Sequence, residues 1–152
     1  MDEASEHYKR AVEHHRDGRL HDAETGYRDV LAIDPRHADT LHMLGIVLSA
    51  RNENDEAVDY IRRALDEQPD NPEFLNNFGV LCKKLNRLDA AIGAYRAALA
   101  CNPAFIDGTY NLANALAQSG EVDEAIDLYR DILARAPSNL QARANLATAY
   151  QK

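Results

Sequence analysis

The sequence has little of what marks several common protein classes. Only two cysteines occur in 152 residues, Cys82 and Cys101, without metal-ligand spacing, so a reducing compartment is expected. No apolar run approaches membrane-spanning length. The formal net charge of −8 disfavours nucleic acid, whose phosphates are bound mainly by Lys and Arg. The N-terminus is acidic and polar, unlike a signal peptide. We therefore expect a cytoplasmic protein with no nucleic-acid or membrane partner.

Catalytic and cofactor motifs are also missing. The glycines do not form a phosphate-binding loop, and no nucleophile, base and orienting group share a helical register. We therefore expect no enzymatic activity in this chain and no cofactor. A metal site is not expected either, because no close histidine pair at i, i+4 has an acidic partner. The histidines considered for it are His7, His14, His15, His21, His37 and His42.

What the chain does have is a period of 34 residues. Three series keep this step: Pro35, Pro69, Pro103 and Pro137; Ala23, Ala57, Ala91 and Ala125; Gly18, Asn52, Asn86 and Gly120. Such a period indicates stacked copies of one supersecondary unit. We place the copies at 4–37, 38–71, 72–105 and 106–139, with a partial copy at 140–152. No low-complexity linker interrupts them, so we expect one domain over residues 1–152.

Each copy is predicted to be a helix, a turn and a second helix. Apolar residues at repeat positions 4, 7, 8 and 11, and again at 20, 21, 24, 27 and 28, have the spacing of helical stripes. Gly or Asn at position 15 suits the left-handed end of the first helix, and Pro at position 32 stops the second. The expected helices span residues 4–17, 21–33, 38–51, 55–67, 72–85, 89–101, 106–119, 123–135 and 140–152.

Small residues occupy position 8, always Ala or Gly, and position 20, always Ala. They allow the two helices of a repeat to approach closely, so we expect Ala91 to press on Gly79. The aromatic residue at position 24 would fill the space beside them, which makes Tyr27, Tyr95 and Tyr129 packing residues.

These patterns resemble the tetratricopeptide repeat, in segments such as Leu-Asn-Asn-Phe-Gly-Val-Leu and Asp-Ala-Ala-Ile-Gly-Ala-Tyr, and in the Asn-Pro that ends the third copy. The resemblance covers nearly the whole chain. It implies an all-α fold, a right-handed superhelical solenoid whose first helices line a concave groove. It also implies a scaffold that binds proteins or peptides.

The end copies depart from the pattern. The first has His7, Arg10 and His14 where other copies are mostly apolar, as a capping repeat would. The partial copy keeps Leu146 and Tyr150 without a second helix to cover them. We expect this last helix to contact a neighbouring molecule or fold onto its own array.

The predicted ligand-facing positions lie opposite the packed stripe of each first helix. At position 6, Asn77, Asn111 and Asn145 form a row, hereafter the asparagine row. The row is similar to the asparagine ladder of O-linked N-acetylglucosamine transferases and their bacterial relatives, and we expect it to bind a peptide backbone. Lys9 and Met43 interrupt it in the first two copies. The other candidate binding residues are His42, Met43, Asn76, Lys83, Lys84, Tyr110 and Asn114.

Several alternatives stay open. The asparagines could be solvated polar residues without a ligand. A clamp for C-terminal carboxylates is disfavoured, because position 5 has no Lys and Asp39, Glu73 and Asp107 bring anions. The chain could also be the substrate-recognition part of a larger glycosyltransferase-like enzyme, or a scaffold that self-associates through its solenoid ends into a homo-oligomer.

Overall fold

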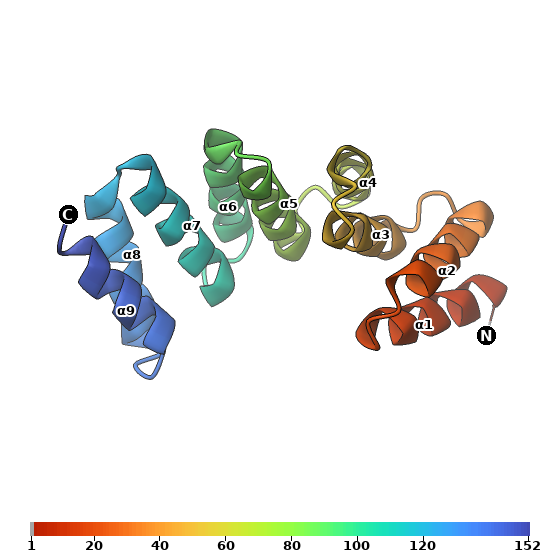
Figure 1. The fold of residues 1–152 in the computed structure, drawn as a ribbon, viewed down its shortest axis with the longest axis horizontal. Helices are drawn as coiled ribbons and strands as arrows, with labels where there is room; N and C mark the ends of the chain where they lie inside the picture. Colours follow the sequence, from red (N-terminus) through yellow and green to blue (C-terminus); the bar gives the residue numbers. More distant parts are fainter. Residues whose placement is uncertain (1) are drawn as a thin grey trace. The chain divides into compact units, whose positions relative to one another are not determined.

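The computed structural model describes residues 2–152, and within them the chain is all-α (Figure 1). Its nine helices agree with the predicted ones to within three residues at every end, and this part of the chain contains no strand. The helices are α1 Glu3–Arg16, α2 Leu20–Ile33, α3 Ala38–Ala50, α4 Asn54–Glu67, α5 Pro72–Lys84, α6 Leu88–Cys101, α7 Ile106–Ser119, α8 Val122–Arg135 and α9 Leu140–Ala149. None of the helices in residues 2–152 combines the length and apolarity needed to cross a bilayer.

The turns have the conformation that the 34-residue series predicted. The backbone at position 15 has positive φ in all four full copies: 77° at Gly18, 62° at Asn52, 58° at Asn86 and 96° at Gly120. Only Gly and, less easily, Asn adopt this left-handed region without much strain. The second helices end two residues before each repeated proline. Turn chemistry therefore sets the C-terminal end of both helices in every full repeat.

The chain divides into two compact units, Met1–Phe74 and Leu75–Lys152, and the boundary falls inside α5. In the first unit, α1 packs on α2 and α3 on α4. Tyr27, Leu44 and Ile61 are fully buried there. A Cβ built on Gly45 would lie 2.5 Å from Ile61 Cγ1, so the small residue at position 8 is a steric requirement.

In the second unit, α7 packs against α6, α8 and α9. Its core contains Tyr95, Leu116 and Tyr129, each at most 2% exposed. A Cβ on Gly79 would lie 2.5 Å from Tyr95 Cε1, and its three nearest atoms all belong to that ring. At Gly79 the closest partner is therefore Tyr95 at position 24, and Ala91 at position 20, which was expected to press on Gly79, does not supply any of these three nearest atoms.

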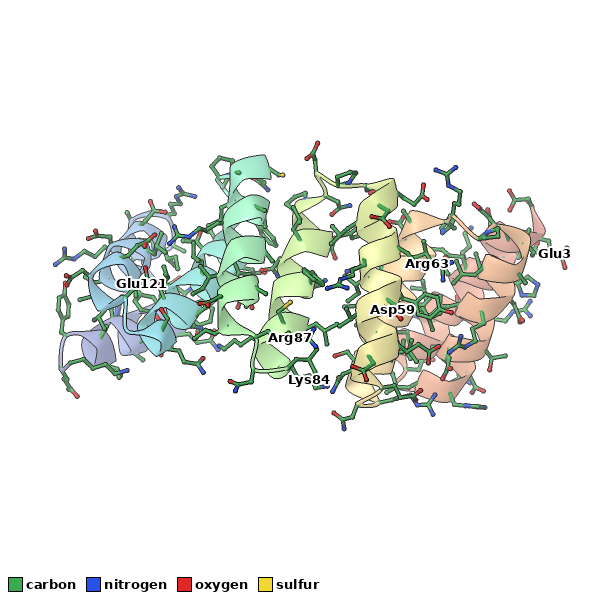
Figure 2. All side chains as sticks on the ribbon, turned by 90° about the horizontal axis from the view of Figure 1, so that it is seen from above. Glu3, Asp59, Arg63, Lys84, Arg87 and Glu121 are labelled. Carbon is green, nitrogen blue, oxygen red and sulfur yellow. The ribbon has the colours of Figure 1, made fainter. Side chains whose placement is uncertain are left out.

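Arginine–glutamate ion pairs join consecutive second helices within each unit. Arg28 on α2 donates to Glu56 on α4 at 2.7 Å, and Arg96 on α6 donates to Glu124 on α8 at 2.8 Å. Both pairs join position 25 of one repeat to position 19 of the next. Other arginines bond to the carbonyl oxygens of repeated prolines: Arg63 (labelled in Figure 2) to Pro35 and Arg135 to Pro103.

The last helix folds onto its own array, one of the two expected outcomes. Leu146 is half-buried against the core of the second unit. Arg130 Nε donates to the Tyr150 hydroxyl at 2.8 Å, and the guanidinium lies 5.5 Å from the ring centroid. Tyr150 is still 55% exposed and Leu140 72%. The helix stops at Ala149 rather than continuing to residue 152.

Candidate functional site

The asparagine row lies within the second unit, where two of its side chains bridge neighbouring repeats. Asn111 Nδ2 on α7 donates to Asn76 Oδ1 on α5 at 3.0 Å. Asn145 Nδ2 on α9 donates to the Tyr110 hydroxyl at 3.0 Å and to Asn114 Oδ1 at 2.9 Å, both on α7. Position 6 of one repeat thus bonds to position 5 of the repeat before it. The row is a hydrogen-bonded seam between first helices as well as a candidate ligand surface.

A tyrosine from the second-helix layer extends this seam. The Tyr129 hydroxyl on α8 donates to Asn114 Oδ1 at 2.5 Å. Burial raises the pKa of Tyr129, and the nearby Tyr110 adds to the rise, so the hydroxyl remains a donor at neutral pH. We call Tyr110, Asn114, Tyr129 and Asn145 the Tyr–Asn cluster. The prediction treated Tyr129 as a packing residue, and its hydrogen-bonding role was missed.

A pocket of about 280 Å³ opens beside the Tyr–Asn cluster, between α7 and α9. Asn114, Asn145 and Tyr129 line it together with Gln118 and Thr148. Ala117, Ala149 and Lys152 complete the lining, which therefore contains no Asp or Glu side chain. The pocket is rich in side-chain amides, although the chain as a whole has a net charge of −8.

The other predicted residues of the second unit differ in how accessible they are. Asn76 is only 7% exposed, and its side-chain oxygen accepts the hydrogen bond from Asn111. Asn77 is half-buried, whereas Lys83 and Lys84 are exposed at the end of α5. Figure 2 shows Lys84 near Arg87, the residue at the N-cap position of α6. These cations form a small basic spot at the α5–α6 turn.

In the first unit, the two predicted binding residues have different environments. Met43 is half-buried. His42 is 3% exposed, and its ring stacks on Phe74 with centroids 4.3 Å apart. Burial lowers the pKa of His42 to about 4, although Asp39 opposes the shift. His42 therefore belongs to the packed interior, where it offers a ligand almost no surface.

Sequence reasoning missed a group of rings in the first unit. Tyr8 lies 6.1 Å from Tyr27 and 5.3 Å from His37, measured between ring centroids. His15 Nδ1 lies 3.3 Å from the Tyr27 hydroxyl. Tyr27 and Tyr129 both occupy position 24, and the hydroxyl of each lies beside a polar side chain of the first helix in the same repeat. This pairing can be recognised only when the packing of the two helices is known.

The first repeat carries a second pocket, of about 200 Å³. His7, Arg10 and His14 line it from α1, and Asp22 and Asp29 from α2. The Nδ1 atom of His14 is buried without a hydrogen-bond partner. Within residues 2–152, no group of three or more His, Cys, Asp or Glu side chains has an arrangement that could hold a metal ion.

Comparison with known proteins gives a consistent picture of the repeats. Models of the tetratricopeptide repeat match residues 8–72, 42–106 and 106–149. No curated protein sequence matches the chain. Among solved structures, the chain is similar to MamA (TM-score 0.87, 23% identity, 97% of this chain and 81% of that one). It is also similar to PilW, a type IV pilus biogenesis factor (0.87, 25%, 99% and 70%). A third similar structure is YrrB, described as having an unusual peptide-binding site (0.81, 21%, 95% and 75%).

Proposed function

Because the chain belongs to the tetratricopeptide repeat family, we propose that it is a non-catalytic scaffold that binds an extended peptide along its first helices. The observation that carries this proposal is the asparagine row with its adjoining pocket in the second unit, which no Asp or Glu side chain lines. Similar solved structures include a protein described as peptide-binding. The partner is a protein or peptide segment, and the expected location remains the cytoplasm.

The row can meet a peptide at regular intervals. Packed helix axes lie about 8–10 Å apart, and an extended peptide rises about 3.3 Å per residue. One asparagine would therefore face roughly every third peptide residue. The bonds within the seam use amide hydrogens of Asn111 and Asn145. The oxygens of these two amides are then the groups best placed to accept peptide N–H groups.

The test begins with a peptide library displayed on phage and selected against the purified chain. The triple variant Asn77→Ala, Asn111→Ala, Asn145→Ala should bind the selected peptides at least about tenfold more weakly, because each hydrogen bond contributes roughly 0.5–1.5 kcal/mol. A control variant, Asp89→Ala with Asp127→Ala, changes exposed residues of second helices and should keep full affinity. Unchanged affinity of the triple variant would move the binding site away from the row.

Two alternative functions have their own tests. The similarity of the row to the ladder of O-linked N-acetylglucosamine transferases favours a substrate-recognition segment of a larger, bacterial glycosyltransferase-like enzyme. The sequence that follows residue 152 in the native gene would decide this. Exposed Leu140 and Tyr150 on and beside α9 favour self-association through solenoid ends. Light scattering at several concentrations would detect a dimer, and a Leu140→Ser variant should then be monomeric.

A further inference from the structure

The hydrogen bonds within the Tyr–Asn cluster determine which of its polar groups remain available to a ligand. A primary amide has two N–H donors and one acceptor oxygen with two lone pairs. Asn145 Nδ2 already donates to Tyr110 and to Asn114. Asn114 Oδ1 already accepts from Asn145 and from Tyr129. The unused groups are therefore the oxygen of Asn145, an acceptor, and the nitrogen of Asn114, a donor.

Tyr129 fixes the orientation of this arrangement. Its side chain is 2% exposed and packs in the core of the second unit with Ala113, the small position-8 residue of the same repeat. A ring held in this way cannot follow a rotating amide. Its hydroxyl proton is directed at Asn114 Oδ1, which turns the Asn114 nitrogen away from the tyrosine. The donor and the acceptor that remain are thus preorganised on a rigid support.

From this geometry we propose that the pocket between α7 and α9 recognises a neutral carboxamide, the side chain of a glutamine or asparagine in the bound peptide, with Tyr129 as the positioning residue. The inference rests on the proposed peptide-binding function and adds a preferred side chain to it. A carboxamide both donates and accepts, so it satisfies Asn145 Oδ1 and Asn114 Nδ2 together. Ala117 and Ala149 leave room beside these groups for the aliphatic stem.

A carboxylate fits the pocket less well. An ionised carboxylate only accepts, so it would place one of its oxygens against Asn145 Oδ1 with no proton between them. Lys152 also lines the pocket and its ammonium group attracts anions, but this residue is exposed to solvent, so salt screens its charge. The inner groups therefore select the amide, and the lysine contributes little at moderate salt.

The test uses three small probes on isotope-labelled protein in moderate salt. They are the methylamides of N-acetylglutamine, N-acetylglutamate and N-acetylmethionine, which differ only at the side chain. We expect the glutamine probe to shift the side-chain amide resonances of Asn114 and Asn145 at concentrations about fivefold or more below those the glutamate probe requires. The methionine probe should shift neither. Equal or tighter binding of glutamate, or no response to any probe, would overturn the carboxamide proposal.

The positioning role has a matched control in the chain. Tyr95 has the same repeat position as Tyr129 and is 1% exposed, but the residue at position 9 of its repeat is Val80, which has no hydrogen-bonding side chain. Tyr129→Phe should reduce the preference for glutamine over glutamate about threefold or more, whereas Tyr95→Phe should leave it unchanged. Equal thermal midpoints in the two variants would show that the change is not due to stability. An unchanged preference in Tyr129→Phe would remove the positioning role.

The experiments distinguish failure of the carboxamide pocket from failure of peptide binding by the asparagine row. If library peptides bind through the asparagine row while the probes give no response, peptide binding stands and the carboxamide pocket falls. If the probes bind as expected but no peptide is selected, the pocket stands and the binding of an extended peptide falls.

Discussion

At the scale of single residues, the clearest requirement is for small side chains at position 8. Gly79→Ala would place a Cβ 2.5 Å from the ring of Tyr95, which is buried and cannot move freely. We expect a loss of roughly 1–3 kcal/mol in the free energy of unfolding. Gly93→Ala makes the same change inside α6 with no atom within 4 Å, so it should gain roughly 0.5–1 kcal/mol through helix propensity. Urea unfolding of both variants measures the two changes in the free energy of unfolding. A more stable Gly79→Ala variant would contradict the close packing of Gly79 against Tyr95.

The candidate binding residues could be proposed from the sequence, but their bonding could not. Helical periodicity assigns Asn77, Asn111 and Asn145 to one face of their helices, because position within a turn determines the face. The bonds to Asn76, Tyr110 and Asn114 depend on how closely neighbouring repeats approach, which one repeat does not encode. Burial of His42 escaped prediction for a similar reason, because its partner Phe74 comes from the following repeat.

At the scale of helices, the repeated arginine–glutamate ion pairs should contribute a measurable coupling free energy between neighbouring repeats. Arg96 binds Glu124 through two nitrogens, at 2.8 and 3.0 Å, and both side chains are about half exposed. A double-mutant cycle with Arg96→Gln and Glu124→Gln should give a coupling of about 0.5–1 kcal/mol in urea unfolding, falling in high salt. The same cycle on Arg130 and Glu124 is the control, because Arg130 bonds to Tyr150. A coupling free energy that does not change with salt concentration would argue against an ionic interaction.

Helix boundaries were predictable because local chemistry sets them. Asn86 and Gly120 tolerate the left-handed conformation that ends the first helix, and Pro103 cannot continue a helix whatever it packs against. The exception is the end of α9, where the sequence has no stop signal. There the helix ends at Ala149, Tyr150 keeps αR backbone angles, and its hydroxyl accepts a hydrogen bond from Arg130.

At the scale of the whole molecule, the two compact units differ in their titratable groups. All six histidines lie between residues 7 and 42, in the first unit, and residues 75–152 contain none. His42 is the one with the largest consequence, because burial lowers its pKa to about 4 while Asp39 opposes the shift only partly. Burial also lowers the pKa of His15. Acid should therefore destabilise the first unit through groups that the second unit lacks.

The acid response of His42 gives a prediction with a definite sign. Its pKa is lower in the folded chain than the ordinary value near 6.5, so its contribution to stability is complete above that value and is lost as pH falls towards 4. Between pH 7 and pH 5 the loss should be roughly 2 kcal/mol. Hydrogen exchange followed by mass spectrometry, corrected for intrinsic rates, should show protection falling in residues 2–74 before residues 75–152. His42→Leu keeps the site apolar against Phe74 and should remove most of this difference, whereas His21→Asn, at an exposed position, should not. Equal loss of protection in both units, unaffected by His42→Leu, would show that the acid response arises from other groups.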